Sequence, residues 1–147
     1  MHMLFNSPKI NEVDLKGWKV IIGGAALPKA MCQEALRRGI DMFTGYGMSE
    51  TCPILSLAQL TPEMLELNHA DQSEIRAKTG RPMGLVEIRI VDNAMNPLPH
   101  DGESTGEIVV RSPWLTQGYF KDQKNSEALW HGGYLHTGDM AHMDEFG

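Results

Sequence analysis

The sequence has few of the residues and runs that mark disulfide-bonded, secreted or membrane-spanning proteins. Its 147 residues include only two cysteines, Cys32 and Cys52, which form no CxxC pattern. We therefore expect two reduced, unpaired thiols in a cytoplasmic protein. No run approaches about eighteen apolar residues, and no basic stretch followed by an apolar one stands at the start, so neither a transmembrane segment nor a secretory signal is predicted.

Positive charge is also scarce. Lys and Arg number 13 against 19 Asp and Glu, which gives a formal net charge of -6. A phosphate backbone is bound by a basic face, and no run of Lys and Arg occurs, so we expect no nucleic-acid partner. At 41% hydrophobic and 22% charged residues, the chain resembles ordinary globular proteins and is long enough to bury a core of its own.

The first half of the chain has the pattern of a βαβ unit. In "KVIIGGAALP" a short β-branched run at 20–22 ends in two glycines, which is typical of a buried strand followed by a tight turn. A helix is predicted to start at Pro28 and to stop at Gly39. The next segment, "IDMFTGYG", is predicted to be a second strand that also ends in glycines. Strands joined by a crossover helix pair in parallel.

The second half changes to the period of two that is typical of antiparallel strands. "LVEIRIVD" and "TGEIVVRS" alternate, and "NAMNPLPHDGEST" between them is rich in turn residues. The polar stretch from Thr51 to Thr79 predicts only a helical turn or two, after Thr61-Pro62. We predict an α/β fold, with a βαβ unit from a mostly parallel sheet in residues 1–78 and an antiparallel sheet or distorted partial barrel in residues 79–147.

The two glycine turns, "GGAA" and "TGYG", end neighbouring parallel strands and are therefore predicted to line one crevice, where ligands of such sheets bind. In "TGYGMSET", Tyr46 offers an aromatic face, Ser49 a hydroxyl for a phosphate oxygen, and Glu50 a carboxylate for a hard cation. On this stretch alone the simpler interpretation is structural. Gly45 and Gly47 then permit a turn, Tyr46 fills the core, and Glu50 starts a helix.

Other polar motifs carry weaker signals. Asp139 in "LHTGD" can accept two hydrogen bonds from a vicinal diol such as a ribose, or it can bond backbone amides in an Asx turn. Both interpretations stay open at this point. Gly118-Tyr119 in "TQGYF" predicts a bulge or bend. His136 and His142 lie six residues apart without a third ligand nearby, which argues against a zinc site.

Taken in order, five motifs resemble the adenylate-forming (AMP-binding) superfamily of acyl-CoA synthetases, luciferases and peptide-synthetase adenylation domains. They are "VIIGGAALP", "TGYGMSET", "AKTGRPMGLVEIRIVD", "GEIVVRSPWLTQGYF" and "GYLHTGDMAHMDEFG", and they cover the chain from about Lys19 to Gly147. Within the superfamily the chain is most similar to medium- and long-chain fatty acyl-CoA synthetases, because Met48 stands where peptide-synthetase domains usually carry Pro. Luciferase-like and aryl- or amino-acid-adenylating enzymes are the alternatives, as is a non-catalytic nucleotide-binding module.

The resemblance implies roles for matching residues. The residues that match nucleotide-contacting positions of the family are Gly24, Thr44, Gly45, Tyr46, Gly47, Ser49 and Asp139. Among them Tyr46 packs on the adenine, while Asp139 holds the ribose hydroxyls. Glu50 matches the Mg²⁺-binding glutamate. Ser49 replaces the family's usual threonine but keeps the hydroxyl, so Ser49 and Glu50 are the candidate catalytic residues.

The implied reaction joins a fatty acid to coenzyme A at the expense of ATP, by way of an acyl-adenylate. Its partners are small molecules, and a peripheral membrane contact of the parent protein stays open. The resemblance places the family's phosphate loop before Met1 and its catalytic lysine after Gly147. We therefore expect a fragment of the large N-terminal domain, with residues 1–3 partly vector-derived, that is inactive by itself.

Overall fold

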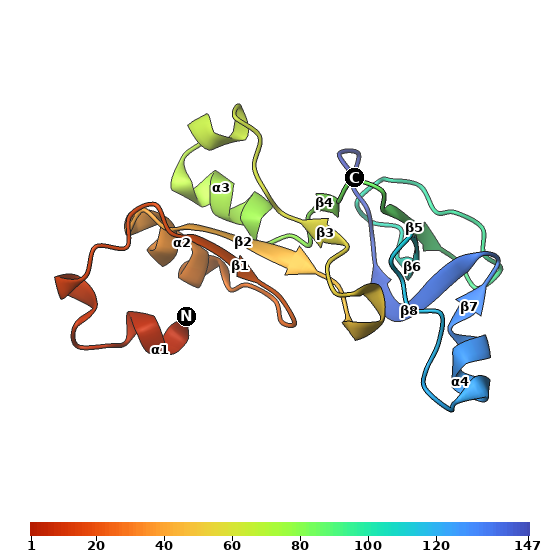
Figure 1. The fold of residues 1–147 in the computed structure, drawn as a ribbon. Coiled ribbons are helices and arrows are strands. Elements are labelled where there is room, and N and C mark those ends of the chain that lie inside the picture. Colours follow the sequence, from red (N-terminus) through yellow and green to blue (C-terminus); the bar gives the residue numbers. More distant parts are fainter. The chain divides into compact units, whose positions relative to one another are not determined.

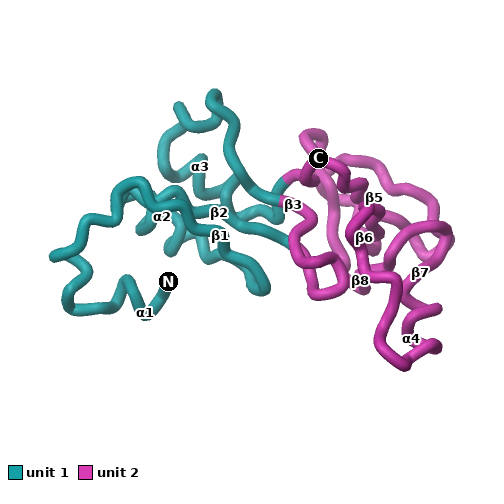
Figure 2. Tube along the Cα trace, viewed as in Figure 1, with its two compact units in different colours: residues 1–46, 57–80 teal, residues 47–56, 81–147 magenta.

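The computed structural model describes residues 1–147 and divides them into two compact units (Figures 1 and 2). Unit 1 comprises Met1–Tyr46 and Leu57–Gly80, and unit 2 comprises Gly47–Ser56 and Arg81–Gly147. The chain therefore passes from unit 1 to unit 2 within the "TGYG" turn. The predicted subdomain division at residues 78 and 79 stays a prediction. No helix is long and apolar enough to cross a membrane.

Unit 1 contains the predicted βαβ unit. Strands β1 (Lys19–Ile22) and β2 (Asp41–Tyr46) pair in parallel, from Lys19 opposite Asp41 to Ile22 opposite Thr44. Helix α2 (Lys29–Arg37) connects them and follows Pro28, as predicted from the sequence. Gly39 adopts a φ of +74° just after the helix, a conformation that favours glycine. The predicted α/β fold class is confirmed.

A second helix, α3 (His69–Arg76), was not predicted at this length. The helical turn expected after Thr61-Pro62 is present as the 3₁₀ helix η3 (Met64–Glu66). The longer helix is capped at its N-terminus by Asn68, whose Oδ1 accepts the N–H groups of Ala70 and Asp71 at 2.9 and 3.0 Å. Helices α2 and α3 pack against each other, and both contact β2.

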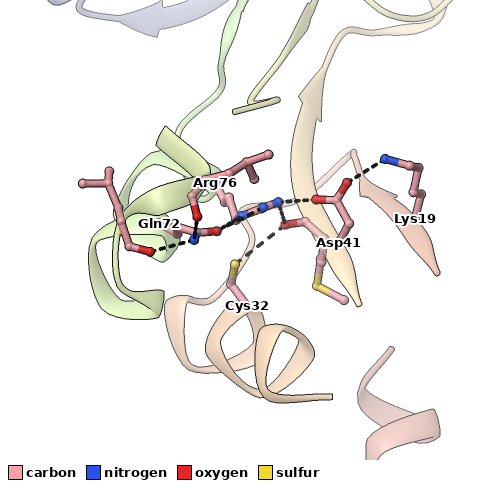
Figure 3. A network of polar contacts seen from close by, with 8 residues as sticks. Lys19, Cys32, Asp41, Gln72 and Arg76 are labelled. Carbon is pink, nitrogen blue, oxygen red and sulfur yellow. Dashed lines mark hydrogen bonds and ion pairs between the residues drawn. The ribbon is translucent and has the colours of Figure 1, made fainter. Parts of the chain in front are cut away.

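A buried polar network joins α3 to β2 (Figure 3). The Arg76 side chain is 3% exposed, and its Nη1 donates to Asp41 Oδ1 at 2.5 Å and to the Met42 carbonyl at 3.2 Å. Its remaining guanidinium nitrogens, Nε and Nη2, donate to Gln72 Oε1 at 3.3 and 3.2 Å. On the other side of the carboxylate, Lys19 Nζ donates to Asp41 Oδ2 at 3.0 Å. The network ties the start of β2 to the helix that covers it.

The apolar core of unit 1 lies between these elements. Its buried members are Ile10, Leu15, Leu27, Cys32, Ala35, Ile40 and Met42. Cys32 is a free, fully buried thiol, and Cys52 is a free, exposed one, in keeping with the predicted unpaired cysteines. Burial raises the pKa of the Cys32 thiol, so it behaves as a small core side chain and not as a reactive group.

Unit 2 is built on an antiparallel sheet, as predicted. Its strand order is β5 (Glu87–Val91), β6 (Gly106–Arg111), β8 (Tyr134–Ala141) and β7 (Trp130–His131). Strand β7 and helix α4 (Gln123–Ala128) were not predicted. The remaining elements of the chain are α1 (His2–Phe5), η1 (Ile10–Glu12), η2 (Ser49–Thr51), β3 (Ser56–Leu57) and β4 (Arg81–Pro82).

Tyr134 anchors one face of this sheet. It is buried with Val91 and Val109, and its hydroxyl donates to Glu87 at 2.8 Å. The guanidinium groups of Arg89 and Arg111 lie 4.8 and 4.4 Å from the centre of its ring. Burial and the hydrogen bond to Glu87 raise the pKa of Tyr134. Arg111 also donates to the Gly133 carbonyl at 3.2 Å, so its guanidinium is held both by the Tyr134 ring and by the main chain.

Candidate functional site

Within unit 1, the two glycine turns lie beside each other at the carboxyl ends of β1 and β2. A Cβ atom added to Gly23 would stand 3.3 Å from the Gly45 carbonyl oxygen. The neighbouring Gly24 is exposed and has a φ of +74°, which leaves its backbone open to a ligand. Tyr46 is half-buried at the end of β2. The two turns of the predicted crevice therefore lie side by side within unit 1, while the crevice itself stays a prediction.

Thr44 has a more restricted position than the other residues of this wall. It is 7% exposed, and its Oγ1 is buried without a hydrogen-bond partner. Its carbonyl accepts the Ala58 N–H at 2.8 Å. The hydroxyl of Thr44 is thus the group without a partner, whereas its carbonyl is already bonded within the unit.

Within unit 2, a rigid turn presents Ser49 and Glu50. Gly47 packs so closely on the following loop that an added Cβ would stand 1.7 Å from the Pro53 carbonyl oxygen. The fully buried Thr51 Oγ1 lies 3.0 Å from the Met48 N–H, 2.9 Å from the Met48 carbonyl and 2.8 Å from the Pro53 carbonyl. Sequence reasoning assigned Thr51 no role, although a hydroxyl three residues after the start of a helical turn is a known capping signal.

Glu50 is held by two contacts from one distant segment. The Tyr119 hydroxyl donates to Glu50 Oε1 at 2.7 Å, and the Thr116 N–H donates to the Glu50 carbonyl at 2.9 Å. The hydrogen bond to Glu50 raises the pKa of Tyr119, with smaller contributions from burial and nearby negative charge. Sequence reasoning predicted only a bend at Gly118-Tyr119. A bridge between Tyr119 and Asp122 marks that bend, but the contact with Glu50, 69 residues away, had no sequence signal.

Asp139 lies in a bulge of β8. The register with β6 passes from Val109 opposite His136 to Glu107 opposite Met140, so residues 137–139 of β8 face a single residue of β6. Asp139 is exposed, and its N–H donates to the Thr137 hydroxyl at 3.1 Å. The two interpretations of the Asp139 carboxylate, a ribose contact or an Asx turn, both stay predictions.

The turn that carries Glu50 and the bulge that carries Asp139 border one cavity of about 500 Å³ in unit 2. Met48 and Tyr119 line it beside Glu50, and Thr137 and Gly138 line it beside Asp139. The other lining residues are Glu107, Asp122, Asn125, Ala128, Leu129 and His136. The candidate site residues thus fall into two groups, one in each unit: Gly24, Thr44, Gly45 and Tyr46 in unit 1, and Gly47, Ser49, Glu50 and Asp139 in unit 2.

Comparison with known proteins identifies the family. A family model described as "AMP-binding enzyme" matches residues 1–120. The chain belongs to this family.

Curated relatives in the AMP-binding family are acid–CoA ligases. The chain is 33% identical over 130 residues to a long-chain-fatty-acid–CoA ligase of Thermus thermophilus, a match that covers 88% of this chain and 24% of that protein. It is 36% identical over 130 residues to a 3-methylmercaptopropionyl-CoA ligase of Ruegeria pomeroyi, again over 88% of this chain and 24% of the relative. The chain thus spans about a quarter of the length of these relatives.

A solved structure shares the fold and part of the sequence. The amide bond synthetase McbA from Marinactinospora thermotolerans is 30% identical with a TM-score of 0.80, over 99% of this chain and 28% of that one. The names of these three proteins differ in the substrate or product. The comparisons therefore establish the family of this chain, but not which carboxylic acid it would use or which acceptor the acid would be joined to.

No group of three or more His, Cys, Asp or Glu side chains is arranged to hold a metal ion. His136 pairs with Glu107 at 2.9 Å. The AMP-binding family implies Mg²⁺, and the donor set near Glu50 fits it: Mg²⁺ is usually held by one or two carboxylates together with substrate phosphates and waters. Tyr119 occupies one oxygen of Glu50, which leaves Oε2 as the candidate metal-binding atom.

Proposed function

We propose that the chain is the nucleotide-binding part of an ATP-dependent acid–thiol ligase, which activates a medium- or long-chain fatty acid as an acyl-adenylate and transfers it to coenzyme A. Membership of the AMP-binding family supports the reaction class. The observation that carries the assignment of the site is the cavity of unit 2, which is bordered by both the Glu50 turn and the Asp139 bulge.

The reaction places specific demands on the residues of the site. The substrate carboxylate attacks the α-phosphorus of ATP, the bond to pyrophosphate breaks, and the thiolate of coenzyme A then displaces AMP from the acyl carbon. Both reactants of the first step are anions, so the protein must position them and offset their charge. In this proposal the Asp139 carboxylate accepts hydrogen bonds from the ribose hydroxyls, and Tyr46 packs against the adenine.

Ser49 and Glu50 act at the phosphate end. The exposed Ser49 hydroxyl donates a hydrogen bond to a phosphate oxygen, and the buried Thr51 keeps the turn from shifting. Mg²⁺, when bound, would neutralise charge on the phosphate oxygens. Tyr119 donates to one oxygen of Glu50 and so fixes the direction of the other. These contacts orient the nucleotide before the acid arrives.

The fatty-acid assignment is the finer part of the proposal. It is supported by the apolar Met48, instead of Pro, after the second glycine of "TGYG" and by the fatty-acid ligase of Thermus thermophilus among the relatives. A second acceptor is also supported by one observation, because McbA, an amide bond synthetase, matches 99% of the chain. In that case an amine would take the place of the coenzyme A thiol.

The test is a substrate screen on the full-length gene product. Carboxylic acids of graded chain length are supplied with ATP and Mg²⁺, and AMP and acyl product are measured with coenzyme A, with an amine, and with neither. We expect thioester formation with medium- or long-chain acids. Amide formation without thioester would favour the second acceptor. ATP binding without pyrophosphate release for any acid would overturn the ligase in favour of a nucleotide-binding module.

Variants connect the activity to the site. Glu50→Gln and Asp139→Ala are each expected to lower kcat/KM for ATP about tenfold or more, because each removes a charged partner of the nucleotide. Asp101→Ala is the matched control, since Asp101 is another exposed turn aspartate whose side chain bonds only residues 103 and 104. Full activity of the Asp139→Ala enzyme would contradict the assignment of the ribose site.

A further inference from the structure

Glu107 holds both flanks of the bulge that carries Asp139. Its Oε2 lies 2.9 Å from His136 Nδ1, and its Oε1 accepts the Gly138 N–H at 3.1 Å. Because an ionised carboxylate can only accept, His136 Nδ1 is the donor in this pair. The Glu107 and His136 side chains are 29% and 20% exposed, so water screens the pair less than it would at the surface.

Thr137 closes the same bulge from inside. Its hydroxyl donates to the Ile108 carbonyl at 2.8 Å and accepts the Asp139 N–H at 3.1 Å. Gly138 between them has a φ of +74°, a conformation that favours glycine. Each of the four residues from 136 to 139 is therefore held by a hydrogen bond. Glu107 bonds His136 and Gly138, and the Thr137 hydroxyl bonds the Asp139 N–H and the Ile108 carbonyl.

We propose that Glu107 is a positioning residue of the nucleotide site, which sets the direction of the Asp139 carboxylate toward the ribose hydroxyls. This inference rests on the proposed function, in which Asp139 binds the ribose. Glu107 acts through the backbone of Gly138 and the ring of His136. A carboxylate suits this task because its two oxygens accept from both donors at the same time, which a shorter or apolar side chain cannot do.

The closing experiment measures how well the full-length enzyme distinguishes ATP from 2′-deoxyATP, which lacks one of the two ribose hydroxyls. In the Asp139→Ala enzyme this preference should largely disappear. In the Glu107→Ala enzyme we expect KM for ATP to rise about tenfold, kcat to change by less than about twofold, and the preference for ATP to fall by a similar factor to KM. The double variant should lose little beyond the Asp139→Ala enzyme, because both changes act on one contact.

A merely structural Glu107 predicts a different pattern. Its removal would then lower activity with both nucleotides equally, add to the effect of Asp139→Ala, and leave the ratio unchanged; this result would overturn the inference. If Asp139→Ala itself keeps the preference for ATP, the ribose assignment in the proposed function fails first, and this inference fails with it. Glu87→Gln, which alters another paired carboxylate of the same sheet, is the control and should keep the preference.

A second variant covers the case in which Glu107→Ala does not fold. Glu107→Gln keeps an oxygen for the Gly138 N–H but loses the charge that accepts from His136. It should show a smaller loss of the preference for ATP, in the same direction. Amide exchange in the 147-residue chain supplies a readout without activity: the Gly138 N–H should exchange faster in Glu107→Met, which removes both acceptor oxygens, than in the wild type, and unchanged protection would overturn the inference.

Discussion

Arg76 and Lys19 bind opposite oxygens of one carboxylate, that of Asp41, but from very different environments. Arg76 reaches Oδ1 at 2.5 Å with a side chain that is 3% exposed, whereas Lys19 reaches Oδ2 at 3.0 Å with a side chain that is 73% exposed. The pair of contacts therefore allows the effect of burial to be compared on the same acceptor.

Replacing Arg76 should destabilise unit 1 far more than replacing Lys19. Arg76→Met leaves Asp41, Gln72 and the Met42 carbonyl without a buried donor, so we expect a loss of about 2–4 kcal/mol in the free energy of unfolding. Lys19→Met removes an exposed ion pair and should cost at most about 1 kcal/mol. Denaturant unfolding followed by circular dichroism measures both. Equal losses would contradict a dominant effect of burial.

The same carboxylate makes the stability depend on pH. Burial alone would raise the pKa of Asp41, but the hydrogen bonds and charges of Arg76 and Lys19 outweigh it and lower that pKa. A lowered folded-state pKa gives stability that is present above the unfolded value of about 3.9 and is lost as the pH falls through the folded value. The stability advantage of the wild type over Asp41→Asn should therefore shrink below about pH 4. An advantage that stays constant down to about pH 2 would contradict this assignment.

The contact between Tyr119 and Glu50 can be tested without any activity. The carboxylate favours the protonated phenol, so Glu50→Gln should lower the pKa of Tyr119 toward the ordinary value of about 10. NMR titration of ring-labelled tyrosines measures the change. Tyr134, whose hydroxyl donates to Glu87, is the internal control and should keep its raised pKa. A Tyr119 pKa that does not move would show that this hydrogen bond is absent in solution.

Gly47 should be required for folding of the Ser49–Glu50 turn. Gly47→Ala places a methyl group 1.7 Å from the Pro53 carbonyl oxygen, and backbone on both sides must shift to relieve the overlap, at a cost of about 3 kcal/mol. Gly84→Ala is the matched control, because an added Cβ there meets nothing within 4 Å. It should change the free energy of unfolding by less than about 0.5 kcal/mol. A tolerated Gly47→Ala would mean that the turn adopts another conformation.

The elements that were predicted well from the sequence are those in which apolar residues form a continuous run or alternate with polar ones. The runs at 20–22 and 41–46 and the alternation in 87–91 and 106–111 all became strands with the expected pairing. Helix α3 escaped prediction because its buried face is polar. Gln72, Ser73 and Arg76 are its buried residues, and they are buried because each has hydrogen-bond partners that lie elsewhere in the sequence or one turn away.

The candidate site was predictable only in part for a related reason. The glycines, Glu50 and Asp139 can be recognised from the sequence, because their residue types indicate turns and charges at their own positions. The groups that orient them cannot be recognised in this way. Tyr119 meets Glu50 across 69 residues, and Glu107 meets Gly138 across 31, so neither contact has a local pattern. These partners follow from the pairing of β6 with β8 and from the turn after Thr116, which only the folded chain displays.

The bulge in β8 adds two residues relative to β6, since three residues on one strand face one on the other. An insertion of one residue would turn every following side chain to the opposite face of the sheet, whereas an insertion of two leaves the alternation intact. Residues before and after Thr137–Asp139 therefore keep their inward and outward directions. The even number of added residues is therefore what lets β8 carry an irregular segment in its middle while both of its ends stay in register with β6.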